Sequence, residues 1–243
     1  MREQRIKQFE KLTSYLEAIP CTINKAQCIN ITEYESNKKA VPTVFFHNEQ
    51  VIKTILRYDD PLTLVFGSAK NPGGGVLRGS TAQEEDIALS STWYFNVKDN
   101  VEFYQLLHKD LTYSDKMLYV NEAYVVKNEL GHYITPKKVS FIGGTAPNVN
   151  GMKTKGLPIN ENYVYDILKN RIIGLLSFAE LYNHKTLIVG AWGCGVFGLD
   201  SNRVADIFKE CILNKLYSCV LVFATINKLE YELFKYKIEN ERC

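Results

Sequence analysis

The chain has 243 residues, of which 46% are hydrophobic and 23% charged, a composition typical of a folded globular protein. Its 29 basic and 27 acidic residues leave a net charge of +2, so there is no electrostatic reason to expect strong binding to nucleic acid or to a membrane surface. No stretch approaches the roughly 20 apolar residues of a membrane span, and the first residues lack the apolar run of a signal peptide. We therefore expect a monomer in the cytoplasm.

Cysteine and histidine form no metal-binding pattern. The six cysteines include no CxxC pair, and no histidine stands at a zinc-type spacing from them. The four histidines are isolated in the sequence, at positions His47, His108, His132 and His184. The sequence therefore predicts reduced thiols, no metal site and no cofactor.

The first half of the chain begins with an amphipathic helix. Residues 2–18 place apolar side chains at three- and four-residue steps, and Pro20 ends the pattern. Because this helix must bury its apolar stripe, residues 1–40 are expected to form a helical accessory segment packed on a core of residues 41–243. Further along, we predict strands at 43–46 and 62–66, a helix at 49–58, and a helix that starts near Ser80 with that side chain as its cap.

The second half continues the alternation of strands and helices. We predict strands at 117–120, 123–127, 139–143, 186–189 and 218–225, and helices at 160–183, 200–214 and 228–238. This alternation indicates an α/β fold of three layers, with a mixed central sheet flanked by helices. Ligands bind such sheets at the carboxyl ends of the strands.

Two glycine-rich loops each lie between a strand of the buried type and a helix, so both are expected at the same edge of the sheet. The first contains Gly73, Gly74 and Gly75, which allow positive φ and a close approach of backbone N–H groups to a ligand. The second consists of Gly193, Cys194, Gly195, Val196, Phe197 and Gly198, and it lacks the signatures of nicotinamide-binding loops and P-loops. Glycine loops ahead of helices favour an anionic group, a diphosphate in particular.

Two adjacent carboxylates, Glu84 and Glu85, follow the first glycine loop. Neighbouring positions on a helix point about 100° apart, so the two side chains cannot do the same job. Mutual repulsion and burial would raise a carboxyl pKa, which would make one of them a general acid near neutral pH. From these residues alone, an ordinary solvated helix start, where acidic side chains interact favourably with the helix dipole, explains the pair at least as well.

The residues around this pair resemble those of a known family. Three glycines, a spacer of seven residues and then Gln83-Glu84-Glu85 are similar to the signature of the microbial-type poly(ADP-ribose) glycohydrolases, which have a macrodomain fold. The second glycine loop resembles the diphosphate loop of that family, and Thr145-Ala-Pro-Asn148 is a weaker match. The resemblance spans roughly residues 40–225, and the N-terminal helix fits the family's accessory segment.

The resemblance implies a role for the two carboxylates. Glu85 would be the catalytic general acid/base that protonates the departing ribose oxygen and then accepts a proton from the attacking water. Glu84 would orient the scissile ribose through its hydroxyl groups. No cofactor takes part in this chemistry.

The resemblance also implies a set of substrate-binding residues. Asn71 would bind the distal ribose, Phe197 would pack against that ribose, and the second loop would wrap the diphosphate. The full set is Asn71, Gly73, Gly74, Gly75, Gln83, Gly193, Cys194, Gly195, Val196, Phe197 and Gly198. Cys194 has no partnered histidine and is interpreted as a packing residue rather than a nucleophile. Adenine contacts vary across macrodomains, and only Ala146, Pro147 and Ile226 are suggested for them.

The function implied is hydrolysis of the ribose–ribose O-glycosidic bonds of poly(ADP-ribose) with release of ADP-ribose. The expected partners are ADP-ribose, its polymer and ADP-ribosylated proteins. One alternative is a hydrolase of another ADP-ribose linkage, on a protein side chain, on nucleic acid or in O-acetyl-ADP-ribose. The other is a non-catalytic module that only binds ADP-ribose, against which the intact Gln83-Glu84-Glu85 argues.

Overall fold

The computed structural model describes residues 1–36, 41–105, 111–214 and 217–239, so His108 lies outside the described residues. The strands are β1 Gln27–Asn30, β2 Thr43–His47, β3 Leu62–Phe66, β4 Lys116–Lys127, β5 Tyr133–Gly144, β6 Thr186–Val189 and β7 Val220–Ala224. The α-helices are α1 Arg2–Ala18, α2 Val51–Arg57, α3 Gln83–Ser90, α4 Trp93–Val97, α5 Val101–Gln105, α6 Val149–Thr154, α7 Glu161–Leu181, α8 Ser201–Leu213 and α9 Lys228–Glu239.

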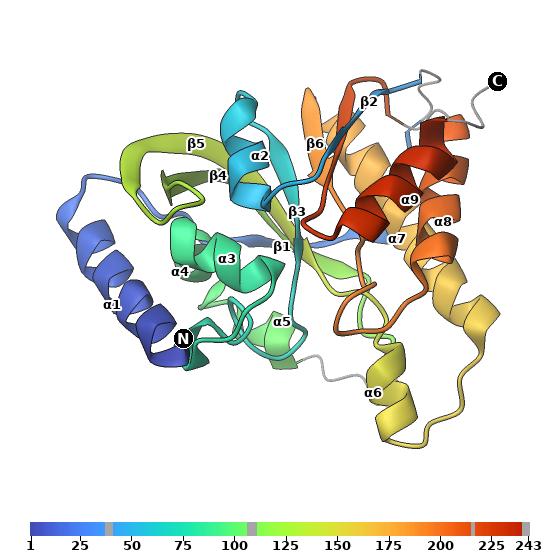
Figure 1. The fold of residues 1–243 in the computed structure, drawn as a ribbon, viewed down its shortest axis with the longest axis horizontal. Helices are drawn as coiled ribbons and strands as arrows, with labels where there is room; N and C mark the ends of the chain where they lie inside the picture. The colour runs from blue at the N-terminus through green and yellow to red at the C-terminus, as the bar shows by residue number, and fades with distance from the viewer. Residues whose placement is uncertain (37–40, 106–110, 215–216, 240–243) are drawn as a thin grey trace.

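The strands form one seven-stranded sheet in the order β1-β4-β5-β3-β6-β7-β2 (Figure 1). Each pair from β5 to β2 in this order is parallel, whereas β1 with β4 and β4 with β5 are antiparallel. The predicted mixed sheet is therefore confirmed. Because β3 and β6 are parallel neighbours, the glycine loops that follow them meet at the same edge of the sheet, as the sequence predicted.

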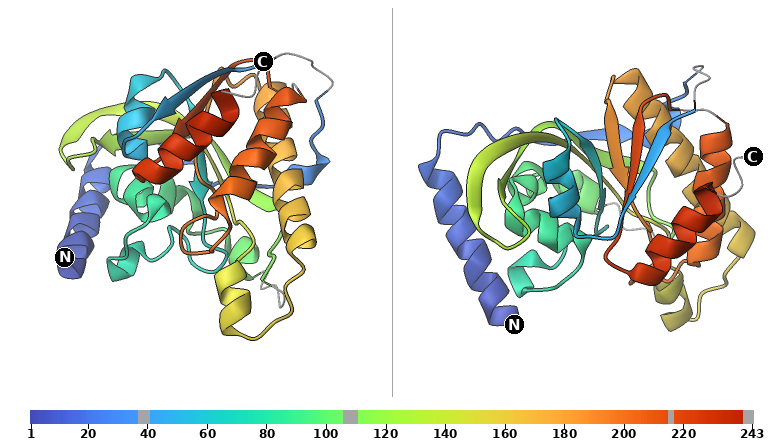
Figure 2. Two further views of the ribbon diagram at one scale, coloured as in Figure 1. Left: turned by 45° about the vertical axis from the view of Figure 1, so that its right-hand side comes forward. Right: turned by 45° about the horizontal axis from the view of Figure 1, so that its top comes forward.

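Helices cover both faces of the sheet and give the three predicted layers (Figures 1 and 2). The alternation of side chains along the strands divides the core. On β3, Leu62 and Leu64 pack into the cluster beneath α7, α8 and α9, whereas Val65 packs into the cluster beneath α1 to α5. The same alternation places Leu187 and Ile188 of β6 in opposite clusters.

Three details differ from the predicted elements. The segment before residue 41 is not only helical, because Gln27–Asn30 form an edge strand that pairs with β4. Residues 117–127 form one strand whose register shifts between Val120 and Ala123, where two strands were predicted. The helix near Ser80 begins at Gln83 and has no side-chain cap, because the chain first forms a short 3-10 helix, Val76–Arg78, that ends at Gly79 in the left-handed region.

The N-terminal helix packs against the part of the core that carries the glutamate pair. Its Leu12 is fully buried, and its Phe9 ring lies 4.9 Å from the ring of Tyr94. Arg5 donates a hydrogen bond of 2.8 Å to Asp86, the residue directly after Glu85. α1 lies at the opposite end of the molecule from α8 and α9 (Figure 2). A boundary between accessory segment and core at residue 40 stays a prediction.

Candidate functional site

The site lies where two neighbouring strands stop pairing. The β3–β6 register comprises only Leu62 with Leu187 and Thr63 with Ile188. Beyond this point, the side-chain amide of Gln83 bonds to the main chain of β3. Its Nε2 donates to the carbonyl of Leu64 (2.8 Å), and its Oε1 accepts from the N–H of Phe66 (2.8 Å). Gln83 thereby ties the start of α3 to the carboxyl end of β3.

Glu84 is buried and held on both of its oxygens. It is 3% exposed, and its Oε2 accepts the N–H of Ser68 (2.7 Å) while its Oε1 accepts the indole N–H of Trp93 (3.2 Å). Burial raises the pKa of Glu84 to about 8, against the opposing effect of these two hydrogen bonds, and the charge of Glu85 adds to the rise. The raised pKa favours the protonated form of Glu84.

Glu85 is also buried, but only one of its oxygens is held. The residue is 7% exposed, and its Oε1 accepts the N–H of Gly75 over 2.7 Å. Its Oε2 is buried and has no hydrogen-bond partner among the described residues. A solvated helix start does not explain this pair, since both carboxyl groups lie inside the protein. Glu85 therefore keeps one carboxyl oxygen that no described residue binds.

The first glycine loop packs directly against these carboxyl groups. Gly73 and Gly74 have φ of 61° and 64°, in the region that favours glycine. A Cβ on Gly74 would lie 2.4 Å from Oε1 of Glu85. The N–H of Gly74 donates a hydrogen bond to the carbonyl of Asn71 (3.0 Å), and the N–H of Gly75 donates one to Glu85. Both N–H groups are therefore bonded within the protein, and a contact of either one with a ligand stays a prediction.

The second glycine loop has the free donors that the first one lacks. Its internal bonds join Leu199 N–H to Gly193 (3.0 Å) and Gly198 N–H to Gly195 (3.1 Å). Within the described part of the chain, the N–H groups of Gly195, Val196 and Phe197 have no acceptor. Consecutive N–H groups without an acceptor are the kind of donors that an anion such as a diphosphate needs.

Cys194 lies in the same loop, and its environment keeps the thiol neutral. Burial raises the pKa of Cys194 to about 12, although a hydrogen bond with Ser201 opposes the rise. A thiol of this pKa is not a nucleophile at neutral pH.

A pocket of about 230 Å³ lies between the second loop and the start of α3. Its walls are mainly apolar, and it contains no lysine or arginine; the lining comprises Phe66, Ala82, Gln83, Ala191, Trp192, Gly193, Gly195, Val196, Phe197, Ala224, Thr225 and Glu230. The suggested adenine contacts are not among these residues. Ala146 is buried beneath Gly193, and Ile226 is 73% exposed.

Sequence reasoning missed several residues of the site. Trp93, which donates a hydrogen bond to Glu84, follows Gln83-Glu84-Glu85 in the sequence. Nothing in the sequence distinguishes it from an ordinary core tryptophan. Trp192 directly precedes the second glycine loop, and its buried indole N–H has no partner among the described residues. Glu230 reaches the pocket from the first turn of α9, where its Oε2 accepts from the Thr225 hydroxyl over 3.0 Å. Nothing local in the sequence indicates this position.

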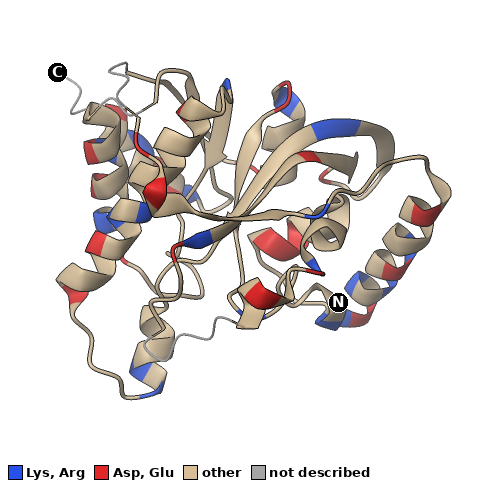
Figure 3. Ribbon diagram, turned by 180° about the vertical axis from the view of Figure 1, so that it is seen from behind, with Lys and Arg blue, Asp and Glu red and all other residues tan. Residues whose placement is uncertain are grey.

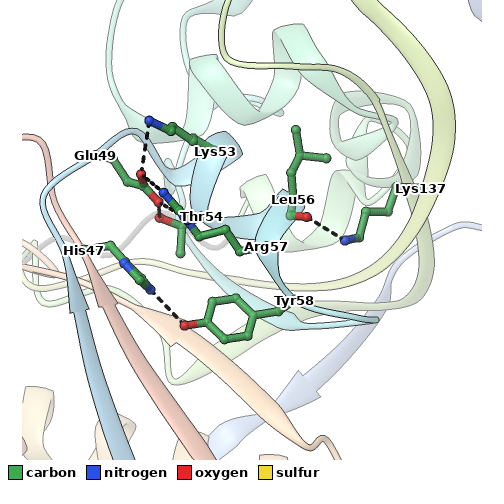
Figure 4. A network of polar contacts seen from close by, with 8 residues as sticks. All are labelled: His47, Glu49, Lys53, Thr54, Leu56, Arg57, Tyr58 and Lys137. Carbon is green, nitrogen blue, oxygen red and sulfur yellow. Dashed lines mark hydrogen bonds and ion pairs between the residues drawn. The ribbon is translucent and has the colours of Figure 1, made fainter.

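A separate polar network joins the end of β2 to α2 (Figure 4). Glu49 accepts two hydrogen bonds from Arg57, of 2.6 and 2.8 Å, which lower the pKa of Glu49 to about 2. The imidazole of His47 lies 2.8 Å from the hydroxyl of Tyr58. These contacts hold α2 in place and contain no group of the site. The described residues contain no cluster of three or more His, Cys, Asp or Glu side chains that could hold a metal ion.

Comparison with known proteins points to one family. Residues 4–128, which are 125 of the 243 residues, match the family model for the catalytic domain of microbial-type PARG, poly(ADP-ribose) glycohydrolase. The fold is similar to that of PARG from Thermomonospora curvata, with a TM-score of 0.86, 24% identity, and coverage of 97% of this chain and 100% of that one. No curated protein sequence matches the chain.

Two solved structures with bound small molecules are also similar. The Thermomonospora curvata enzyme bound to the inhibitor ADP-HPD has a TM-score of 0.85 at 24% identity, with 97% of this chain and 100% of that chain covered. The Deinococcus radiodurans PARG in complex with ADP-ribose has a TM-score of 0.80 at 25% identity, with 89% and 95% covered.

The raised pKa of Glu84 makes a prediction about stability. Between the usual pKa of 4.5 and about 8, the folded protein holds a proton that the unfolded chain has lost. The free energy of unfolding, relative to that of Glu84→Gln, should therefore fall as the pH rises through this interval, by a few kcal/mol at most. Urea denaturation of both proteins at about pH 5 and about pH 8.5 measures the difference. A difference that does not change with pH would contradict the burial of an ionisable group here.

The contact between Gly74 and Glu85 makes a second prediction. Gly74→Ala introduces a Cβ against a fixed carboxylate as well as strain at φ 64°. Gly131→Ala is the matched control, because Gly131 has φ 82° and nothing within 4 Å of an added Cβ. We expect Gly131→Ala to destabilise the protein by about 1–2 kcal/mol and Gly74→Ala by clearly more. Equal losses in urea denaturation would show that the carboxylate does not fill this space.

Proposed function

The chain belongs to the microbial-type poly(ADP-ribose) glycohydrolase family, so it is a glycosidase that releases ADP-ribose from poly(ADP-ribose), and we propose that Glu85 is its general acid/base. The observation that carries this assignment is the buried Oε2 of Glu85, which has no partner among the described residues although Oε1 is fixed by Gly75. A carboxyl group held at one oxygen and free at the other has the orientation that proton transfer requires.

The ligand is proposed to bind with its diphosphate on the second glycine loop. The free N–H groups of Gly195, Val196 and Phe197 supply donors, and no basic side chain lines the pocket. Basic and acidic residues are interspersed along the chain rather than gathered at one end (Figure 3), which is consistent with recognition of the anion by backbone dipoles. The apolar pocket beside this loop takes the adenosine part of the ligand.

The distal ribose lies between the two loops in this arrangement. The side chain of Asn71 makes no hydrogen bond within the described residues, so its amide is available to the ribose hydroxyls. Phe197 packs on the other side of the sugar. The raised pKa of Glu84 favours its protonated form, whose carboxyl group can donate a hydrogen bond to a ribose hydroxyl.

The reaction then needs one acid/base group. Glu85 donates its proton to the oxygen of the departing ribose as the bond to the anomeric carbon breaks. Water attacks the oxocarbenium-like centre from the solvent side and transfers a proton back to Glu85. The product is free ADP-ribose, and Glu85 returns to its protonated form.

A module that only binds ADP-ribose would not need this arrangement. Burial of two carboxyl groups, at 3% and 7% exposure, lowers the stability of the folded state. Such a loss of stability is expected to be retained only where the groups have a function. Catalysis at the anomeric carbon supplies that function. We therefore favour the hydrolase over the reader.

The cellular setting is also a proposal. The described part of the chain contains no helix long and apolar enough to cross a membrane. The five described cysteines are free thiols, which is consistent with the reducing conditions of the cytoplasm. We propose that the protein acts there as a monomer on polymer attached to ADP-ribosylated proteins.

Glu85→Gln tests the assignment of the acid/base. This variant should release ADP-ribose from polymer at least 10²-fold more slowly than the wild type, while calorimetry still detects ADP-ribose binding, because only the proton donor is lost. Asp86→Asn is the control, since Asp86 is the next residue on the same helix but faces Arg5 at 2.8 Å. Turnover by Glu85→Gln close to that of Asp86→Asn would contradict the assignment of Glu85 as the acid/base.

The linkage is tested by comparing substrates. We expect the protein to release ADP-ribose from a polymer-modified protein and to leave the last, protein-linked ADP-ribose in place. A protein that carries only single ADP-ribose units should then be hydrolysed at least 10²-fold more slowly. Faster release from the singly modified protein would favour the alternative linkage, and binding without release from either would favour the reader.

A further inference from the structure

One arginine extends from the helix layer to the loops beneath the site. Arg171 of α7 is 1% exposed. Its Nε donates to Asp115 over 2.8 Å, and its terminal nitrogens donate to the carbonyls of Thr112 (2.9 Å), Tyr113 (3.0 Å) and Thr145 (2.9 Å). Burial of a guanidinium destabilises a protein unless such bonds offset its desolvation, and an apolar side chain fills a core position at least as well. Packing alone therefore does not explain an arginine at this position.

The segment that Arg171 holds has a strained backbone. Leu111 and Tyr113 have φ of 59° and 61°, in the left-handed region that residues other than glycine rarely adopt. Such a conformation persists only where the surrounding structure determines it, and strained residues cluster at functional sites. Here the guanidinium binds the carbonyls of Thr112 and Tyr113 directly. The strained backbone therefore indicates that the contacts of this segment have a functional role.

Tyr113 connects the strained segment to the second glycine loop. Its ring centroid lies 6.0 Å from that of Phe197, and its hydroxyl accepts a hydrogen bond of 3.2 Å from Asn148. The backbone N–H of Asn150 donates a hydrogen bond to the carbonyl of Phe197 (3.0 Å). The side-chain amide of Asn150 donates another to the carbonyl of Val196 (3.1 Å). The tip of the loop is therefore held by the segment at Tyr113 and by the segment at Asn148 and Asn150.

Arg171 bonds to both of these segments. It holds the first through Thr112 and Tyr113, and the second through Thr145, which lies three residues before Asn148. We propose that Arg171 is a positioning residue for catalysis, which places Phe197 and the free N–H groups of its loop where they bind the distal ribose and the diphosphate. This inference rests on the proposed function of the loop. Misplacement of a substrate by about 1 Å can slow turnover about 10²-fold.

Arg171→Lys is the first test, because lysine keeps the charge but cannot bond to four acceptors in a fixed plane. The variant should release ADP-ribose from polymer roughly 10- to 100-fold more slowly, and calorimetry should show weaker ADP-ribose binding. Lys169→Met is the matched control: Lys169 is a basic residue of the same helix whose ion pair is with Glu210 on α8. The control should turn over like the wild type.

A double-mutant cycle separates positioning from general stability. If Arg171 acts through Phe197, then Arg171→Lys should change kcat/KM little in a Phe197→Leu background, whereas a merely structural role would multiply the two losses. All rates are measured where urea denaturation shows each variant to be folded. Independent, multiplicative effects would overturn the inference.

If Arg171→Lys does not fold, Tyr113→Leu tests the same inference. This variant leaves the guanidinium in place and removes the ring that faces Phe197, so the same fall in kcat/KM and in ADP-ribose affinity is expected. Wild-type turnover and wild-type affinity would overturn the inference. If the wild type itself releases no ADP-ribose, the proposed function fails, and the calorimetric affinities of the same variants still decide whether Arg171 positions the loop.

Discussion

The hydrogen bonds between the Gln83 amide and the main chain of β3 are the constraint on which the rest of the site depends. β3 and β6 stop pairing after Thr63, and this separation leaves the Leu64 carbonyl and the Phe66 N–H without the β6 partners that they would have in a longer ladder. Gln83 satisfies both groups with one side chain. The same contact fixes the first turn of α3, so the two glutamates that follow it are held at a defined place. The Gln83 side chain thus both fills the gap left where β3 and β6 separate and fixes the position of the two carboxyl groups.

The two glutamates differ because their surroundings differ. Glu84 receives N–H donors on both oxygens, whereas Glu85 receives one from Gly75 and keeps its second oxygen free within the described chain. Burial raises the pKa of Glu84 to about 8, which favours the protonated form of this carboxyl group. The glycine loops have complementary roles. The first provides space and a hydrogen bond for the carboxyl groups, and the second has free N–H donors, on which we propose that the diphosphate binds. A chain of small net charge can bind a dianion in this way.

The sequence predicted the three layers, the mixed sheet and the meeting of both glycine loops at one edge, because strand and helix periods and glycine runs are local signals. It did not predict the short strand at Gln27–Asn30, whose pairing partner is about 90 residues away in the chain. For the same reason it could not show that Gly74 and Gly75 use their N–H groups inside the protein, or that Glu230 reaches the pocket from α9. Arg171 carries a signal only in retrospect, as a charged residue among the apolar positions of a long helix. Such contacts depend on which distant segments meet, and no local pattern specifies that.

A crystal structure of the protein with ADP-ribose tests the account most directly. The diphosphate oxygens should accept hydrogen bonds from the N–H groups of Gly195, Val196 and Phe197, and the anomeric carbon of the distal ribose should face the free oxygen of Glu85. A diphosphate bound on the first glycine loop, or a distal ribose whose anomeric carbon points away from Glu85, would contradict it.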